Sequence, residues 1–251
     1  MKSPAPNDPV LAPHAPLTEF YQQPENRATY VNRLFDNSAQ YYDWISSVLS
    51  FGMDKLYRRM ALQKAGLRAG MRVLDVATGT GLVAEAALRI GVRPADLIGL
   101  DPSRGMLLEN QKARSISLIQ SIGERLPFAD RSFDFVVMGY ALRHVESLPA
   151  LFTEFRRVLK PGGRALILEI SRPDSQIGFK MLRLYMQKFV PWLARRHTSN
   201  PDLATLMEYY WATIAECVPP QSIVEALRAS GLTDVQRKTY GPILNDYVGN
   251  N

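Results

Sequence analysis

Cysteine and histidine are scarce in this sequence. Its 251 residues include one cysteine, Cys217, and three histidines, His14, His144 and His197. A single cysteine excludes an internal disulfide framework, and histidines this far apart in the chain offer no metal-ligand spacing. The sequence therefore predicts neither a disulfide-stabilised fold nor a bound metal.

Long apolar runs are also missing. No stretch approaches the roughly 20 consecutive apolar residues that a transmembrane helix needs, and the first residues include a lysine without the apolar segment of a secretory signal. These absences argue against an integral membrane protein, and we expect a cytoplasmic one. With 46% hydrophobic residues, a chain of this length can bury a substantial core as one domain.

Charge is mixed along most of the chain. The formal net charge is +6, but acids are interspersed among the bases and no basic-aromatic RNA motif is present, so we expect no nucleic-acid partner. Residues 175–201 differ, because they contain no Asp or Glu and carry five bases, Lys180, Arg183, Lys188, Arg195 and Arg196. On a helix, Lys180 and Arg183 share one stripe beside a broad apolar surface. Two interpretations stay open: a lid helix packed on the core, and a basic amphipathic helix at a membrane surface.

Residues 73–90 have the pattern of a strand, a glycine turn and a helix. The turn holds Thr78, Gly79 and Gly81, and its glycines leave no Cβ on the side from which a ligand would approach. Unpaired N–H groups at the start of the helix also face such a ligand. The pattern therefore predicts a nucleotide-binding edge. Gly79, Gly81 and Ala84 alone also fit the dinucleotide fingerprint, so the motif by itself is weak.

Two acids make this edge more specific. Asp75 lies within the first strand, and Asp101 ends a second strand at about the offset of a ribose-binding carboxylate. An acid as close before the glycines as Asp75 suits an ammonium better than a pyrophosphate. The alternative for Asp75 is a buried strand residue with a capping role.

Strands and helices alternate over about a hundred residues. We predict strands at 73–76, 97–100, 116–120, 133–138 and 165–169, with helices at 82–90, 102–113 and 148–159 between them. This alternation predicts an α/β fold with a doubly wound, mostly parallel sheet, which binds ligands at the carboxyl ends of its strands. Asp75, Gly79, Asp101, Gly123 and Tyr140 would meet at that edge.

The two ends of the chain have other patterns. Residues 1–25 are rich in proline, and we expect them to be disordered or loosely attached. Residues 26–251 would form a single domain, in which 26–66 and 175–217 are helical cover over the substrate side. We expect residues 36–38 to break the helix at 26–49, Pro191 to end the helix at 177–190, and strands at 235–240 and 243–248 to close the chain as a hairpin.

Several motifs together resemble a known family. Leu74-Asp-Val-Ala-Thr-Gly-Thr-Gly, Gly99-Leu-Asp-Pro-Ser and Leu159-Lys-Pro-Gly-Gly are similar to class I S-adenosylmethionine-dependent methyltransferases. More narrowly, Phe35-Asp-x-x-Ala-x-x-Tyr-Asp and Tyr140-Ala-Leu-Arg-His-Val resemble the ubiquinone and menaquinone biosynthesis C-methyltransferases. Those enzymes methylate a ring carbon of a polyprenylated benzoquinol or naphthoquinol. The resemblance covers about residues 30–173 well.

The resemblance implies S-adenosylmethionine as cofactor and a hydrophobic quinol as substrate. The cofactor-binding residues it suggests are Asp75, Thr78, Gly79, Gly81, Asp101, Pro102, Gly123 and Glu124. Asp75 would accept from the ammonium and Asp101 from the ribose hydroxyls. The chain departs from the family at Ile122, where an Asp commonly accepts from the adenine amino group, so the resemblance implies that this hydrogen bond is missing. Glu124 or a backbone carbonyl could replace it.

The resemblance places Arg143 at the substrate, and attack by a phenolate on the methyl group would be helped by a base beside it. Arg143 would hold the phenolate or a carbonyl oxygen, because its guanidinium stays protonated and cannot serve as a base. His144, where the family usually has Asn, would take the phenol proton, with Tyr140 and Tyr42 orienting the ring. The alternative is that His144 caps the helix or makes a local hydrogen bond.

Other functions stay open at this point. The chain could methylate another phenolic or polyketide-like small molecule, or it could be a non-catalytic subunit that binds the cofactor or a lipid quinone in a biosynthetic complex. Peripheral contact with the inner face of a membrane and a homodimer are also retained as alternatives.

Overall fold

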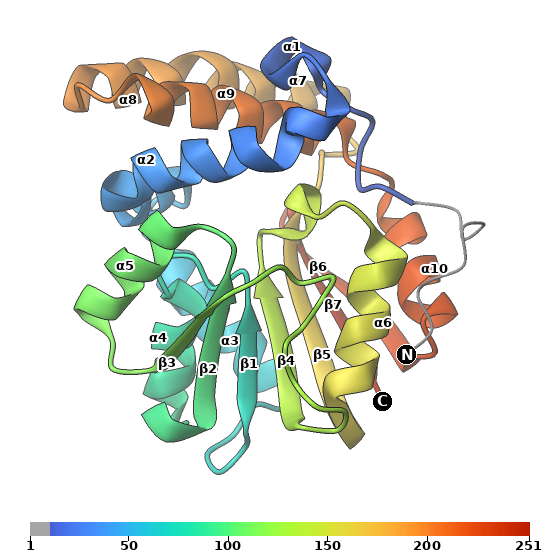
Figure 1. The fold of residues 1–251 in the computed structure, drawn as a ribbon. Coiled ribbons are helices and arrows are strands. Elements are labelled where there is room, and N and C mark those ends of the chain that lie inside the picture. Colours follow the sequence, from blue (N-terminus) through green and yellow to red (C-terminus); the bar gives the residue numbers. More distant parts are fainter. Residues whose placement is uncertain (1–10) are drawn as a thin grey trace.

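A seven-stranded sheet forms the centre of the molecule. The computed structural model describes residues 11–251, and its strands lie in the order β3-β2-β1-β4-β5-β7-β6 (Figure 1). The first five strands of the chain pair in parallel, and β7 runs antiparallel to both of its neighbours. The bounds are β1 Val73–Val76, β2 Leu97–Asp101, β3 Ser117–Gln120, β4 Phe133–Gly139, β5 Leu159–Ile170, β6 Thr233–Tyr240 and β7 Leu244–Asn250. The predicted doubly wound, mostly parallel sheet is therefore confirmed.

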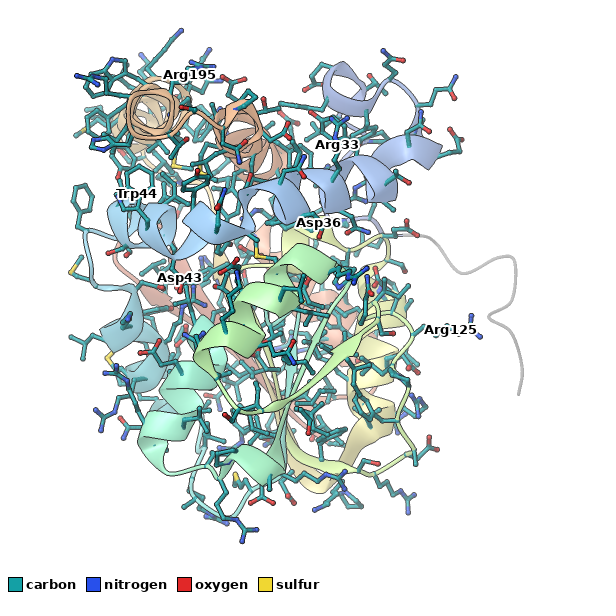
Figure 2. All side chains as sticks on the ribbon, turned by 60° about the vertical axis from the view of Figure 1, so that its left-hand side comes forward. Arg33, Asp36, Asp43, Trp44, Arg125 and Arg195 are labelled. Carbon is teal, nitrogen blue, oxygen red and sulfur yellow. The ribbon has the colours of Figure 1, made fainter. Side chains whose placement is uncertain are left out.

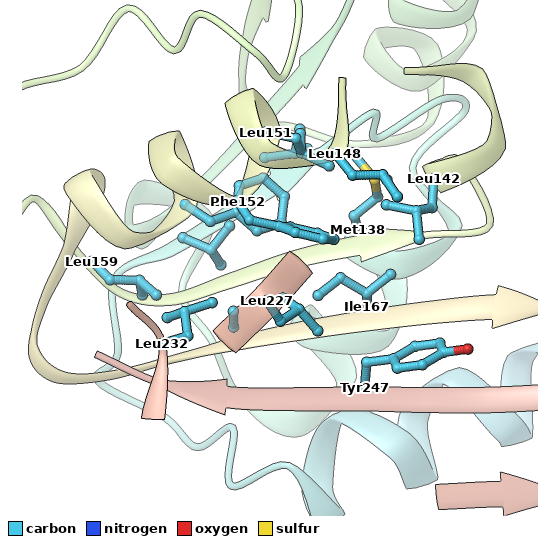
Figure 3. Close-up of a cluster of buried hydrophobic side chains, with 14 of the residues drawn as sticks. Met138, Leu142, Leu148, Leu151, Phe152, Leu159, Ile167, Leu227, Leu232 and Tyr247 are labelled. Atoms are coloured by element: carbon cyan, nitrogen blue, oxygen red, sulfur yellow. The ribbon is translucent and has the colours of Figure 1, made fainter. Parts of the chain in front are cut away.

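Helices cover both faces of the sheet. Helices α3 (Asp54–Lys64) and α4 (Leu82–Ile90) pack on one face, and α6 (Leu148–Val158) and α10 (Pro220–Ala229) on the other. Figure 3 shows this second core, in which Phe152 and Leu227 meet Ile167 of the sheet. The central strands β1 and β4 are buried on both faces, because parallel strands lie beneath helices on each side.

A third layer of helices lies beyond the carboxyl ends of the strands. Figure 1 shows α2 crossing over the strand ends, with α8 and α9 above it. The layer has its own core of side chains from α2 and the C-terminal helices. Its helices are α1 (Thr18–Tyr21), α2 (Arg27–Leu49), α7 (Gln176–Leu184), the π-helical turn η4 (Tyr185–Phe189), α8 (Val190–His197) and α9 (Pro201–Glu216). The remaining helices of the described chain are η1 (Pro24–Asn26), η2 (Pro94–Asp96), α5 (Arg104–Ala113) and η3 (Leu142–His144).

The predicted break at residues 36–38 is wrong. Helix α2 runs without interruption from Arg27 to Leu49. Its Asp36 does not cap a new helix; Asp36 Oδ1 accepts from Ser103 Oγ at 2.6 Å and from the Gly105 N–H at 2.7 Å. Asn37 donates to Asp202 of α9, and Ser38 is buried. These polar residues, which are typical of a turn, therefore lie within a helix, and two of them form hydrogen bonds with other elements.

The predicted helix end at Pro191 is also wrong. The chain stays helical through α7, η4 and α8, and Pro191 lies in the first turn of α8. The π-helical turn just before it offers the widened hydrogen-bond ladder in which a residue without an N–H fits.

The N-terminal segment differs from the expectation in its described part. Residues 1–10 lie outside the described residues. From residue 11 on, the chain packs against the body of the protein: the Leu148 N–H donates to Leu11 O and the Val218 N–H to Pro13 O. Leu17 and Tyr21 are buried in the third layer. The described part of this segment is thus attached by its backbone and apolar side chains.

Candidate active site

One cavity lies where α2 crosses the carboxyl ends of β1, β2 and β4. Its volume is about 230 Å³. Of the predicted cofactor residues it is lined by Gly79, Asp101, Pro102, Gly123 and Glu124, and of the predicted catalytic residues by Tyr42, Tyr140 and His144. Asp75, Thr78, Gly81 and Arg143 are not among its lining residues. The cavity is bordered by strand ends on one side and α2 on the other.

The Asp101 carboxylate joins two of the loops at this edge. Its Oδ2 accepts from the Gly79 N–H and its Oδ1 from the Ser103 N–H, both at 2.8 Å. Burial raises the pKa of Asp101 to about 6, although both backbone hydrogen bonds favour the charged form. Each oxygen keeps a free lone pair, so the carboxylate can still accept from a ligand in the cavity.

The glycine turn leaves room beside Asp101. Gly79 has a φ of 56°, and a Cβ built there would meet no atom within 4 Å. Gly81, also in the left-handed region, precedes α4 and is packed against Asn110, so it shapes the turn without reaching the cavity. The open space beside Gly79 lets a ligand approach the backbone closely.

Asp75 lies behind the turn. Its side chain is fully buried; Oδ2 accepts from Thr78 Oγ1 at 2.6 Å, and Oδ1 has no hydrogen-bond partner. Burial raises the pKa of Asp75 to about 7. An unpartnered buried carboxylate oxygen is costly, and a cationic group near the turn would lower this cost.

The strand ends also carry backbone strain. Ala77 follows β1 and Tyr140 follows β4, and both line the cavity with positive φ values of 54° and 61°. Positive φ is uncommon for residues with a Cβ and is concentrated at functional sites. Both residues turn the chain away from the sheet at the point where a ligand would lie.

The loops after β2 and β3 border one side of the cavity. Met106 and Gly123 line the cavity there, and Ile122 is 48% exposed. The Glu124 Oε1 accepts from the Glu146 N–H at 2.6 Å, and burial raises the pKa of Glu124. One carboxylate oxygen of Glu124 thus accepts a backbone hydrogen bond, and the other takes no part in that bond.

Aromatic side chains enclose the other end of the cavity. His144 lies edge-on to Phe35, with ring centroids 5.2 Å apart, and stacks on Tyr209 at 5.8 Å. Phe35 in turn packs near Tyr42. Flat faces of this kind suit a planar ring.

The environment of His144 suits a neutral imidazole. Neither ring nitrogen has a hydrogen-bond partner, which gives no support to a cap or local bond. Burial first, and then the positive charges of Arg143 and Arg27, hold the pKa of His144 well below its usual value. A neutral imidazole has one donor and one acceptor nitrogen. The predicted proton acceptor would therefore be a very weak base here.

Arg143 is placed differently from the prediction that it holds the substrate oxygen. Its side chain is completely buried and forms an ion pair with Glu169, which is buried as well. The guanidinium also donates to Thr213 and lies over the Tyr210 ring at 4.5 Å. Without a conformational change, Arg143 acts on the cavity through its charge and its support of neighbouring aromatics.

Sequence reasoning expected α2 as part of the cover but named only Tyr42 of this helix as a site residue. Its inner side lines the cavity with Arg27, Ala28, Val31, Asn32 and Phe35. Asp36 and Asp43 on the same helix hold it to the sheet half through Ser103 and Thr80, and Figure 2 shows both acids on the side of α2 that faces the sheet. The helical spacing of these residues was a usable signal, which the expected break at 36–38 obscured.

No ligand set for a metal is found among residues 11–251, where no three His, Cys, Asp or Glu side chains come close enough together. The polar side chains around the cavity are suited to hydrogen bonding with an organic ligand.

Comparison with known proteins identifies close sequence relatives. The model of the ubiE/COQ5 methyltransferase family matches residues 23–243. A demethylmenaquinone methyltransferase from Beutenbergia cavernae is 39% identical over 176 residues, which cover 70% of this chain and 72% of the relative. A ubiquinone/menaquinone biosynthesis C-methyltransferase UbiE from Pseudomonas putida is 38% identical over 207 residues, covering 78% of this chain and 81% of the relative.

Solved structures share the fold at lower identity. A SAM-dependent methyltransferase from Aquifex aeolicus aligns with a TM-score of 0.58 and 16% identity, over 79% of this chain and 91% of the other. Phosphoethanolamine N-methyltransferase 2 from Haemonchus contortus, in complex with S-adenosyl-L-methionine, aligns with a TM-score of 0.60 and 16% identity, over 94% of this chain and 60% of the other. At these identities the likeness concerns the fold alone.

Proposed function

The chain belongs to the ubiE/COQ5 methyltransferase family, and we propose that it transfers a methyl group from S-adenosylmethionine to a ring carbon of a hydrophobic benzoquinol or naphthoquinol. The observation that carries the proposal is the composition of the cavity. It joins Asp101 and the open glycine turn at one end to an aromatic enclosure around His144 at the other. Two sequence relatives are named for quinone methylation.

The cofactor end fits S-adenosylmethionine, whose sulfonium supplies an electrophilic methyl group when it is bound. Asp101 would accept from the ribose hydroxyls, and the space beside Gly79 would admit the methionine part. Asp75 would act from behind the turn, because its unpartnered oxygen and raised pKa favour a nearby ammonium, reached directly or through water. Pro102 and Gly123 would border the adenosine.

Thr78 and Gly81 would support this end indirectly. Thr78 binds Asp75, and Gly81 fixes the start of α4. For the adenine amino group, Glu124 is the remaining acceptor on the side where Ile122 replaces the family's Asp. Losing one hydrogen bond to a charged acceptor weakens binding by about 1.5 to 3 kcal/mol, which lowers the affinity for the cofactor without abolishing binding through its other contacts.

The aromatic end would hold the quinol ring. Phe35, Tyr42 and Tyr140 offer ring faces and His144 a polar edge. We revise the role of His144 from base to neutral hydrogen-bonding group. A phenol with a pKa near 10 does not transfer its proton readily to an imidazole whose pKa is far below 6.5. His144 would instead position the ring hydroxyl, as the amide of the family's Asn could.

The buried guanidinium of Arg143 would favour a negative charge on the substrate oxygen. Charges act more strongly across a medium of low dielectric constant than in water, and Arg143 is followed directly by His144 at the cavity. Its ion pair with Glu169 reduces this field. Arg143 is thus proposed as a positioning and electrostatic residue.

A quinol with a polyprenyl tail partitions into bilayers, so the proposal includes peripheral contact with a membrane. None of the helices in the described part of the chain is both long and apolar enough to cross one. The predicted homodimer remains a prediction.

The experiment that tests the proposed function compares acceptors. Purified protein and labelled S-adenosylmethionine are incubated with a reduced naphthoquinone, a reduced benzoquinone and a simple phenol of matched solubility. We expect transfer to at least one quinol and much slower transfer to the phenol. Binding of S-adenosylmethionine without transfer to any acceptor would favour a non-catalytic subunit.

A further inference from the structure

Large apolar side chains are exposed on one side of the helical layer. Of the ten exposed large hydrophobic residues in the described chain, eight lie in two segments, the turn before α3 with the first turn of that helix, and the continuous helix α7-η4-α8. We call these residues the apolar face; they are Phe51, Met53, Leu56, Ile177, Met181, Leu184, Phe189 and Trp192. Several are exposed by more than 60%, among them Ile177 at 73% and Met181 at 68%.

The two segments form one surface. The Phe51 ring stacks on Tyr185 with centroids 5.7 Å apart, and Tyr185 stacks on Phe189 at 5.6 Å. Phe189 then contacts Trp192 at 6.0 Å. Tyr185 also donates from its hydroxyl to Val48 O at the end of α2. A ladder of aromatic rings thus joins the two parts of the apolar face.

Packing within the molecule does not account for this face. The same helix turns other residues inward, where Met186, Val190 and Ala194 are buried against α2 and α9. A lid helix needs only that inner side to be apolar. Contiguous apolar surface that stays exposed marks a site of interaction.

Along α7, η4 and α8, the helical part of the apolar face, the charged residues are all basic. Residues 175–201 contain no Asp or Glu, and Lys180, Arg183, Lys188 and Arg196 are exposed and form no ion pair with a carboxylate of the described residues. Arg195 pairs with Glu208 at the edge of α9, and Figure 2 shows Arg195 on the outer side of this layer. Exposed apolar residues among unpaired bases complement an anionic lipid surface, where the bases meet headgroups and the rings enter the interface.

We propose that the apolar face docks on an anionic bilayer surface. The inference rests on the proposed function in one respect, since a lipid quinol gives the docking a purpose, but the binding itself requires no substrate. The face belongs to the helical layer that covers the strand ends (Figure 1), so docking brings the bilayer to the cavity side of the molecule. The partner is the lipid surface, and a protein partner or a second copy of this chain is an outcome of the test.

The test uses the fluorescence of Trp192. Full-length protein is mixed with phosphatidylcholine vesicles with and without phosphatidylglycerol, and with vesicles whose acyl chains carry bromine, which quenches nearby tryptophan. Quenching is expected at low salt with phosphatidylglycerol and is expected to fall as salt rises. The Trp192→Phe variant should lose the quenched component, because Trp211 is buried and Trp44 is partly buried.

Two sets of variants separate the apolar and charged contributions. Met181→Ser with Leu184→Ser should weaken vesicle binding by at least about tenfold, and Lys180→Gln with Lys188→Gln by about 25-fold. Leu108→Ser, at an exposed leucine on α5, is the matched control and should bind as the unchanged protein does. All variants should methylate a water-soluble, short-tailed quinol at the normal rate in the absence of vesicles.

Two results would overturn the proposal. One is absence of vesicle binding at low salt in a folded protein. The other is a dimer, seen by sedimentation equilibrium, that Met181→Ser with Leu184→Ser dissociates while vesicle binding is unaffected. A protein that docks but methylates no quinol would keep this inference and contradict the proposed function.

Discussion

The backbone N–H of Gly79 donates to the Asp101 carboxylate at 2.8 Å, joining the turn after β1 to the end of β2. This bond explains how a short glycine turn and an acid more than twenty residues later act as one unit. The carboxylate holds the turn, and its free lone pairs still face the cavity.

Removing this carboxylate should weaken cofactor binding. Asp101→Ala loses the proposed charge-assisted bonds to the ribose, each worth about 1.5 to 3 kcal/mol, and should raise the Kd for S-adenosylmethionine measured by calorimetric titration. Asp96→Ala, at a surface acid paired with Arg93, is the control. Unchanged affinity in a folded Asp101→Ala protein would remove Asp101 from the binding site.

Cofactor affinity should depend on pH through the same group. The pKa of Asp101 is raised to about 6, and only the charged form accepts two hydroxyl hydrogen bonds. Asp101 should therefore contribute a fall in affinity of up to about tenfold per pH unit well below pH 6, and none above about pH 7. Asp101→Asn should lack this contribution and keep the one from Asp75, whose pKa is about 7. A wild-type affinity that is the same at pH 5 and pH 8 would contradict the assignment.

Asp75 should lower stability at high pH in the absence of cofactor. The folded protein keeps its proton up to about pH 7, whereas the unfolded chain releases it near 3.8. The stabilisation from neutral Asp75 is therefore fully present below about pH 4 and is lost as pH rises through 7. In urea unfolding at pH 8, the free energy of unfolding of Asp75→Asn should exceed that of wild type by up to about 4 kcal/mol. At pH 4 the two proteins should differ little.

The same Asp75→Asn variant should bind S-adenosylmethionine more weakly, since it lacks the charge proposed to face the ammonium. Gain of stability together with loss of affinity is the expected pair of results. A variant that is less stable than wild type at pH 8 would indicate that Asp75 stays charged in the fold.

Breaking the buried ion pair should destabilise the protein. Arg143→Met leaves Glu169 buried without its partner and should cost about 3 to 5 kcal/mol in urea unfolding. Replacing both residues, Arg143→Met with Glu169→Met, should cost less than the single change. Equal stability of wild type and Arg143→Met would argue that Arg143 is free to serve the substrate.

His144 should affect the rate without setting its pH dependence. His144→Asn keeps hydrogen-bonding capacity and should retain most of the single-turnover rate, whereas His144→Leu should lose up to about tenfold, the value of one neutral hydrogen bond. Between pH 6 and 9, wild type and His144→Asn should give parallel profiles. An acid limb near pH 6.5 in wild type that His144→Asn abolishes would restore His144 as the base.

Local patterns predicted the sheet well. The strand Val73–Val76, the helix Leu82–Ile90 and the approach of Asp101 to Gly79 follow from apolar runs, glycines and the geometry of parallel strands. Pairings between distant parts of the chain could not be predicted in this way. The sequence around Asp36 predicts a turn, whereas in the structure Asp36 accepts a hydrogen bond from Ser103. Arg143 was predicted to bind the substrate, whereas in the structure it forms an ion pair with Glu169.

The low pKa of His144 is another feature that local sequence patterns could not predict. Its neighbours in sequence suggest an ordinary histidine, but burial and the positive charges of Arg27 and Arg143 lower its pKa. These effects depend on how α2 and η3 pack together, which no local pattern specifies.

The most direct test of the central claim is the position of the transferred methyl group. Protein is incubated with S-adenosylmethionine labelled in its methyl carbon and with a reduced, short-tailed demethylmenaquinone, and the product is characterised by mass spectrometry and carbon NMR. The account predicts one labelled methyl on a ring carbon, formed much more slowly by Asp101→Ala. A label found only on an oxygen atom, or no labelled quinone at all from a protein that binds the cofactor, would contradict it.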